Sequence, residues 1–284
     1  MIIDLHTHSY YSADGQTSIS ELLDLYSAGD IVALTDHETI AGWNNFRDEA
    51  LERGITPIWG VEWFLSGCCH ILSYFISEIP QSFFDYMYER REKERNSMKL
   101  LYNKAKENFP AISSYEKILE TRLHPENILG ITALADNIVN SNYEKTNCEE
   151  VLGILRNWKR EIPESDRPQT FNPEDIVQLI ASWNGISVLA HPFKNPSHKD
   201  GRRSWTEVEK KVKELAFMGI RGVELYSYGS NLKELGLLLP LARELNLLVS
   251  IGSDYHNKEK GLNCSELERL DESLKNEVVK WLTT

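Results

Sequence analysis

The sequence has little cysteine, and its few cysteines are not arranged for crosslinking. There are four among 284 residues; Cys68 and Cys69 are adjacent and awkward to bridge, and none lies in a Cys-x-x-Cys spacing. A chain of this length buries a core that needs no crosslinks. We therefore expect free thiols and a reducing, cytoplasmic location.

Long apolar runs and clustered basic charge are also missing. No stretch approaches the ~20 apolar residues that span a bilayer, and no basic segment opens the chain. With 31 basic and 43 acidic residues the formal net charge is −12, which disfavours binding along a long nucleic acid duplex. We expect a soluble protein without membrane contact, whose partner is a small phosphorylated molecule or the end of a short oligonucleotide. The oligomeric state stays open.

Short apolar runs alternate with helical patterns at both ends of the chain. Residues 1–79 predict a β-α-β-α-β order followed by a strand at 68–76, and the alternation resumes after residue 173. These repeats favour a mainly parallel sheet. Helices are predicted at residues 18–28, 39–53, 205–218, 232–245 and 265–281.

The middle of the chain has a different pattern. A long charged helix is predicted at residues 83–108, followed by shorter helical pieces and no clear strand. We therefore predict one domain from residues 1–79 and 173–284, interrupted by an inserted helical subdomain, residues 80–172, that caps the substrate.

The histidines of this chain cluster beside its apolar runs. Six of its eight histidines fall in five short segments at or just beside apolar runs, often with an acidic neighbour: His6 and His8, His37, His70, His191 and His256. Imidazole and carboxylate are the usual ligands of Zn, Mn or Fe. A hydrogen-bonded histidine at one strand end is the ordinary alternative, but its recurrence after several strands favours a metal site.

The spacing of these residues indicates how their side chains could meet. His6 and His8, like Asp254 and His256, are spaced i, i+2, so each pair leaves one face if it continues the preceding strand. If the first and last pairs share a site, the first and last strands lie side by side, which a closed β/α barrel arranges. Such barrels place their chemistry at the C-terminal ends of the strands.

The ordered motifs resemble those of the polymerase and histidinol phosphatase (PHP) family. They are His6-Thr-His8-Ser9, Ser12-Ala13-Asp14-Gly15, Leu34-Thr35-Asp36-His37, Gly60-Val61-Glu62, His70-Ile71-Leu72, Ala190-His191-Pro192, Gly222-Val223-Glu224-Leu225-Tyr226 and Gly252-Ser253-Asp254-Tyr255-His256. Within the family, the chain is most similar to small stand-alone phosphoesterases that act on nucleoside bisphosphates, nucleoside monophosphates or the 5′ ends of short RNA.

The resemblance implies a distorted seven-stranded β/α barrel that holds two to three divalent ions, Mn, Zn or Fe. Asp14 stands where some members have histidine, and a carboxylate there favours Mn or Fe. Relatives tend to carry a Gly-Arg-Pro-His-like stretch in the insertion, which this chain lacks. The implied ligand sets are His6, His8, Glu62 and Asp254 for one ion, Asp14, His37 and His256 for a second, and Glu62, His70 and His191 for a third.

Clustered ions explain how a phosphate ester is hydrolysed without a nucleophilic side chain, because a metal-activated water attacks in line. Glu62 would bridge two ions, its alternative being a strand-end ion pair. His37 is assigned as a ligand and Asp36 as its support, and this pair is also a candidate to assist the departing oxygen. Glu224 either forms a structural ion pair or orients a histidine.

Substrate contacts are less sharply defined. Arg91 and Arg95 share a helix face and are candidates to bind a non-reacting phosphate, or they pair with neighbouring glutamates. Lys194 is a further phosphate candidate, or a surface lysine. Aromatic residues after barrel strands stack on a base or pack at the rim: Tyr226, Tyr228 and Tyr255. His124 and His198 are treated as surface residues.

These observations predict a metal-dependent phosphoesterase. Its substrate would be a phosphomonoester of a nucleotide or the terminal linkage of a short oligonucleotide. The alternatives are a phosphatase of the histidinol phosphate type and, from another class, a non-catalytic scaffold that metals stabilise.

Overall fold

The computed structural model describes residues 1–12, 14–65, 69–120, 128–141, 147–195, 201–227, 229–257 and 264–283. The chain divides into two compact units. We call residues 1–83 with 170–284 the barrel unit, and residues 84–169 the helical unit. Cys68, Tyr228, His124 and His198, for which expectations were stated above, lie outside the described residues.

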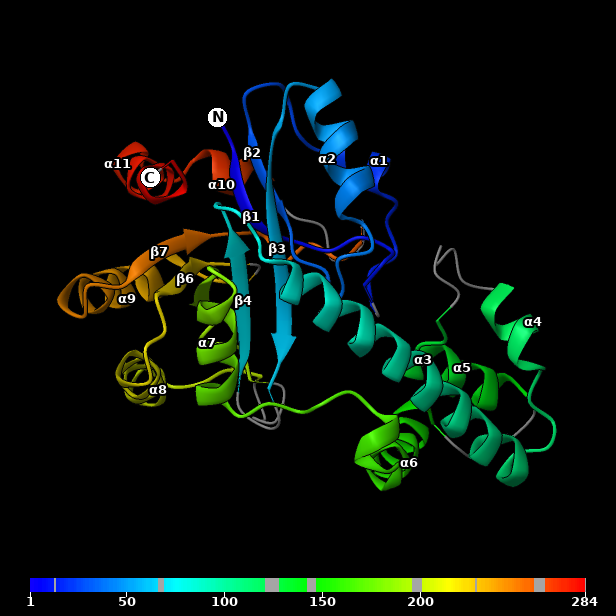
Figure 1. Ribbon diagram of the computed structural model, residues 1–284. Coiled ribbons are helices and arrows are strands. Elements are labelled where there is room, and N and C mark those ends of the chain that lie inside the picture. Colours follow the sequence, from blue (N-terminus) through cyan, green and yellow to red (C-terminus); the bar gives the residue numbers. More distant parts are fainter. Residues whose placement is uncertain are drawn as a thin grey trace. The chain divides into compact units, whose positions relative to one another are not determined.

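Seven strands of the barrel unit form one sheet in chain order (Figure 1). Parallel pairs join all neighbours except the fourth strand, which runs antiparallel to both of its neighbours. The predicted barrel and the mainly parallel sheet are therefore confirmed, with one reversed strand. The strands are β1 (Ile3–Thr7), β2 (Ile31–Leu34), β3 (Thr56–Phe64), β4 (His70–Phe75), β5 (Ile186–Leu189), β6 (Gly222–Tyr226) and β7 (Leu248–Ile251).

The sheet closes where the residues after β7 meet β1. The backbone N–H of Asp254 donates to the carbonyl of His6 (2.7 Å), and the N–H of His8 donates to the carbonyl of Tyr255 (2.9 Å). Gly252 permits this approach, since a Cβ there would lie 2.4 Å from the Cβ of His6. The expected neighbourhood of the first and last strands is confirmed.

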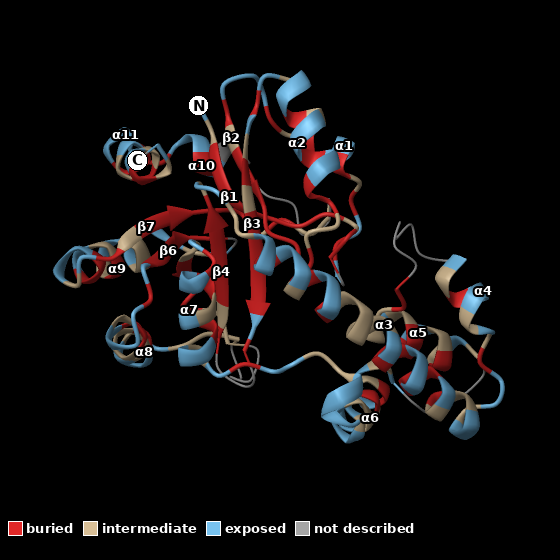
Figure 2. Ribbon diagram, in the orientation of Figure 1, coloured by how far each residue is buried: buried red, intermediate tan, exposed pale blue. Residues whose placement is uncertain are grey.

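Helices of the barrel unit lie outside the sheet, whose strands are mostly buried (Figure 2). Capping boxes fix three helix starts, at Ser18, Ser204 and Asn231. The helices are α1 (Ile19–Leu23), α2 (Trp43–Glu52), α7 (Pro173–Ser182), α8 (Trp205–Phe217), α9 (Leu232–Glu244), α10 (Cys264–Glu268) and α11 (Glu272–Leu282).

Two helix predictions are wrong in detail. The helix expected at residues 18–28 ends at Leu23, after little more than one turn. The single helix expected at residues 265–281 is broken, because Asp271 accepts the N–H of Ser273 and starts α11 as a new helix.

The described residues between the two parts of the barrel are helical. Four α-helices and one 3₁₀ turn are described from residue 81 to residue 169, and no strand occurs among the described residues there. The elements are α3 (Gln81–Asn108), whose first residues belong to the barrel unit, α4 (Tyr115–Glu120), α5 (Ile131–Asn140), α6 (Cys148–Glu161) and the turn Glu164–Asp166.

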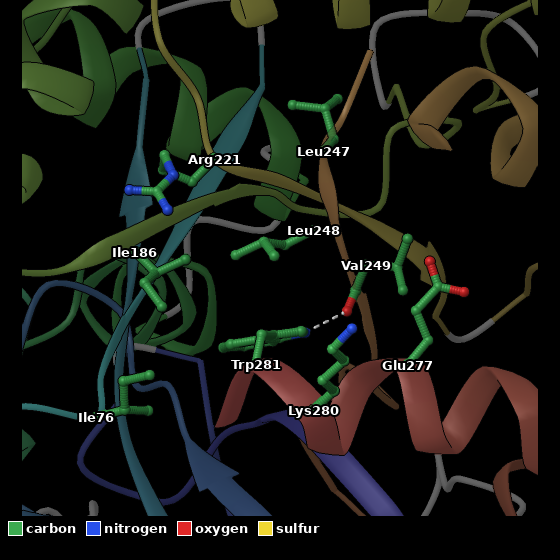
Figure 3. Close-up of a pocket in the computed structure, with 9 residues that line it drawn as sticks. All are labelled: Ile76, Ile186, Arg221, Leu247, Leu248, Val249, Glu277, Lys280 and Trp281. Carbon is green, nitrogen blue, oxygen red and sulfur yellow. Dashed lines mark hydrogen bonds between the residues drawn. The ribbon is translucent and has the colours of Figure 1, made fainter. Parts of the chain in front are cut away.

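A cavity of about 460 Å³ lies at the end of the barrel where the parallel strands begin (Figure 3). Trp281 of α11 lines it and donates from Nε1 to the carbonyl of Val249 (2.9 Å). Its walls are mostly apolar, and none of the predicted metal ligands lines it. In the described residues, no helix is both long and apolar enough to cross a bilayer.

Candidate metal centre

All nine predicted ligands lie in the barrel unit, and most follow the C-terminal ends of its strands. His70 differs: it is the first residue of β4, and it reaches the same end because β4 is reversed. His6 and Glu62 lie within β1 and β3, near the C-terminal ends of these strands. The nine residues are His6, His8, Asp14, His37, Glu62, His70, His191, Asp254 and His256.

The first predicted ligand set is compact. The Nε2 atom of His6 lies 3.0 Å from Oε2 of Glu62 and 3.5 Å from Oδ1 of Asp254. The Nε2 atom of His8 lies 3.0 Å and 3.6 Å from the same two oxygens. Ligands about 2.1 Å from a tetrahedral ion lie about 3.4 Å from one another. This spacing matches the shape of a coordination shell.

The second and third sets meet around two carboxylates. Oδ2 of Asp14 lies 3.3 Å from Nε2 of His37 and 3.3 Å from Nε2 of His256. Oε1 of Glu62 lies 2.8 Å from Nδ1 of His70 and 3.0 Å from Nε2 of His191. Glu62 therefore offers one oxygen to each of two neighbouring sets.

Grouping by proximity gives two groups among the described residues, and they differ from the predicted sets at three positions: His8, His191 and His70, which joins neither group. His8 joins Asp14, His37 and His256, whereas His191 joins His6, Glu62 and Asp254, with the donor atoms of each group within 4.8 Å of one another. His8 lies between both groups, because its ring stacks on that of His256 with centroids 4.2 Å apart while its Nε2 lies 3.0 Å from Oε2 of Glu62.

Two buried imidazole nitrogens test whether the residues fit metal ions. Nε2 of His8 and Nδ1 of His37 are buried and make no hydrogen bond among the described residues, although each lies near Oε2 of Glu62, at 3.0 Å and 3.4 Å. Buried polar atoms normally have a partner. Both nitrogens lie near a carboxylate oxygen but do not form a hydrogen bond with it, as expected when nitrogen and oxygen bind the same metal ion. The donor atoms therefore fit Zn, Mn or Fe.

Opposite charges set the ionisation of the buried groups. Burial alone would raise the pKa of Glu62, but His6 and His37 lower that pKa well below its usual range. Burial would lower the pKa of His6, and Glu62 and Glu224 raise it well above 6.5. The pKa of Asp254 is likewise held low, chiefly by His6 against the effect of burial. The carboxylates are thus anionic and demand positive charge.

A family comparison agrees with this geometry. The model of the PHP domain matches residues 4–152. The chain belongs to the PHP domain family. This membership confirms the expectation of a metal-dependent phosphoesterase, a hydrolase.

Two curated relatives cover most of the PHP chain. It is 28% identical over 269 residues to a 5′-3′ exoribonuclease of Haemophilus influenzae, covering 89% of each chain. It is 26% identical over 264 residues to a 3′,5′-nucleoside bisphosphate phosphatase of Chromobacterium violaceum, covering 91% of this chain and 88% of the relative.

Solved structures show the same fold. A Bifidobacterium adolescentis protein, described as a candidate metal-dependent phosphoesterase, superposes with a TM-score of 0.65 at 21% identity, covering 98% of this chain and 95% of that one. A Chromobacterium violaceum amidohydrolase, solved with bound sulfate and no metal, gives 0.63 at 25% identity, covering 94% and 96%.

Asp36 supports the loop beside the PHP metal centre. Its carboxylate accepts the backbone N–H of Ser9 (2.6 Å) and the hydroxyl of Ser9 (2.8 Å), and burial raises its pKa to about 7. The hydroxyl of Ser12 accepts the N–H of His37 (3.2 Å). The contacts with Ser9 give Asp36 a supporting role in this loop, and assistance to the departing oxygen by the Asp36/His37 pair stays a prediction.

The predicted substrate contacts differ in where they lie. Lys194 donates to the carboxylate of Asp254, directly beside the ligands. Arg91 and Arg95 lie on α3 in the helical unit, and Arg95 pairs with Glu92 of the same helix.

The aromatic candidates favour rim packing. Tyr226 is buried, and its hydroxyl donates to the carboxylate of Glu266. Tyr255 is buried as well, with its hydroxyl 3.2 Å from that of Thr17. Neither ring therefore offers an open face for stacking on a base.

Phe64 was not among the candidates. Its ring stacks on that of His37, with centroids 4.0 Å apart, and meets His70 edge-on at 4.7 Å. It is 40% exposed. Phe64 follows Glu62 by two residues on β3, so both side chains leave the same face of the strand. This spacing could have identified Phe64 from the sequence.

Proposed function

We propose that this chain hydrolyses a phosphomonoester of a nucleotide, a nucleoside mono- or bisphosphate, or the terminal linkage of a short oligonucleotide. The observation that carries the proposal is the convergence of nine predicted ligand side chains on one end of the barrel, with Glu62 shared between sets. The names of the two curated relatives, which concern nucleoside bisphosphates and RNA ends, support this class of substrate.

We propose that two or three divalent ions bind here, and that Mn, Zn or Fe is the native metal. Such ions would neutralise phosphate charge, lower the pKa of a bound water and clamp the attacking and leaving oxygens. The ligand sets are those predicted above, with His8 placed between two of them. Carboxylate Asp14 supports the harder ions, Mn and Fe.

The chain's own residues then bind and orient the substrate. Lys194, now paired with Asp254, is proposed to bind a phosphate oxygen, because ions bound at Asp254 would compete for its carboxylate. Arg91 and Arg95 are proposed contacts for a second phosphate on the basis of their charge and spacing. Asp36 holds Ser9 and thereby the loop that carries His8 and Asp14.

Composition supports the setting of the reaction. The excess of acidic residues disfavours binding along a long duplex, but it does not oppose binding of a short oligonucleotide end. Cys148 is a free cysteine, which supports our proposal of a reducing cytoplasm.

A phosphate-release screen tests the proposal. The substrates are nucleoside monophosphates, 3′,5′-bisphosphates, 5′-phosphorylated oligonucleotides, sugar phosphates and histidinol phosphate, with Mn, Zn and Mg supplied in turn. We expect the highest kcat/KM on a nucleotide or oligonucleotide end. Preference for histidinol phosphate would favour the alternative phosphatase, and no release from any ester with any metal would refute the proposal.

A further inference from the structure

Glu224 is a buried carboxylate that belongs to none of the ligand sets. It lies in the middle of β6 and is 1% exposed. Its two oxygens face two different ligands, which come from β1 and from the turn after β5. A buried carboxylate is costly unless its oxygens are satisfied, so both contacts matter to the fold of the site.

The first contact concerns the ring of His6. Nδ1 of His6 lies 2.9 Å from Oε1 of Glu224, while Nε2 lies 3.0 Å from Oε2 of Glu62. An imidazole that donates its Nδ1 proton to a carboxylate presents the lone pair of Nε2 on the opposite side of the ring. Glu224 therefore directs Nε2 of His6 toward Glu62 and the other predicted ligands.

The second contact concerns the backbone of His191. Its N–H donates to Oε2 of Glu224 (2.6 Å), and its φ angle is +27°, in the left-handed region that side chains rarely adopt. From that backbone, Nε2 reaches Oε1 of Glu62 at 3.0 Å. The hydrogen bond stabilises a conformation that would otherwise cost free energy.

We propose that Glu224 is a positioning residue that sets the donor nitrogen of His6 and the backbone of His191 together, so that neighbouring ion positions form as one unit. The proposal rests on the metal binding included in the proposed function. If Glu224 were only a structural partner, its replacement would lower the stability of the fold. It would then change metal affinity no more than replacement of another buried carboxylate does.

The experiment titrates Mn or Zn into the metal-free full chain by calorimetry. Glu224→Gln keeps the shape but cannot accept both N–H groups as a carboxylate does, and we expect metal affinity to fall about 10- to 100-fold. Glu224→Asp keeps the charge, and partial recovery of affinity relative to Gln is expected. Glu94→Gln is the matched control, since Glu94 is a partly buried carboxylate paired with Lys159 in the helical unit, and its affinity should equal that of the unchanged chain.

A second readout follows the His6 ring directly. In the zinc-loaded protein, nitrogen NMR should show His6 protonated at Nδ1, and exchange of that proton with water should accelerate in Glu224→Gln. Unchanged metal affinity and an unchanged His6 spectrum in a folded Gln variant would overturn the proposal. If Gln does not fold, affinity in Glu224→Asp equal to that of the unchanged chain would do the same.

The two proposals fail separately. A chain that binds ions tightly yet releases no phosphate refutes the phosphoesterase substrate class, while the affinity comparison at Glu224 still decides the role of that residue.

Discussion

The apolar core of the helical unit and the candidate metal centre of the barrel unit bury opposite kinds of side chain. The core of the helical unit is an apolar cluster that includes Met98, Leu101, Leu134 and Leu155, all fully buried. At one end of the barrel unit, His6, His8 and Glu62 are equally buried. The comparison teaches that burial has two uses in this chain: in one unit it stabilises packing by removing apolar surface from water, and in the other it holds charged donors in place for cations.

The largest expected effect is on turnover. His8→Ala removes a donor that lies between two ligand groups, so phosphate release should fall by orders of magnitude while the fold, checked by circular dichroism, remains. Hydrolysis at a near-normal rate by the metal-depleted variant would contradict the mechanism.

Leu155→Ala should lower the stability of the helical unit and leave metal binding unchanged. Leu155 is fully buried in the apolar cluster, so its truncation should cost about 2–5 kcal/mol in the free energy of unfolding of the helical unit. Denaturant unfolding measures this, and calorimetric metal affinity should not change. A parallel loss of metal affinity would show that the two cores are not separable in this way.

Metal removal tests the charged core by itself. With free ions at about 100 times their dissociation constant, binding should add about 2.7 kcal/mol to the free energy of unfolding. A chelator should therefore lower the thermal midpoint of the unchanged chain, and should lower it less in His8→Ala. Equal midpoints with and without chelator would count against bound ions in the native protein.

The smallest effect is expected at the rim. Lys194→Met should raise KM about tenfold, as expected for loss of one charge-assisted hydrogen bond to phosphate. Metal affinity should not fall, because the ions would no longer compete with Lys194 for the carboxylate of Asp254. Lys213→Met is the control, because Lys213 pairs with Glu209 on α8. If both variants have the same KM, Lys194 is an ordinary surface lysine.

Sequence patterns predicted the barrel because ligands from both chain ends had to meet, and His6 and Asp254 do meet. They did not reveal that β4 is reversed, since a short apolar run has no direction in its composition. The spacing argument for Asp254 and His256 also does not apply as stated: Asp254 has a φ of +59°, so the chain turns there instead of continuing β7.

Residues around the ligands were harder to foresee. The two contacts of Glu224 depend on which strands neighbour β6, and a single glutamate within an apolar run carries no such information. Phe64 was within reach of the alternation rule, whereas the partner of Lys194 comes from a segment sixty residues away, which only the folded chain brings near.

The seam between β1 and the residues after β7 has a further consequence. The hydrogen bonds that complete the barrel involve the peptide groups of His6, His8 and Asp254, whose side chains are also proposed to hold the ions. Breaking these hydrogen bonds would open the sheet and separate the side chains that bind the ions. Ion binding should in turn stabilise the closed sheet. The amide protons of His8 and Asp254 should accordingly be among those whose exchange with solvent slows most when the ions bind.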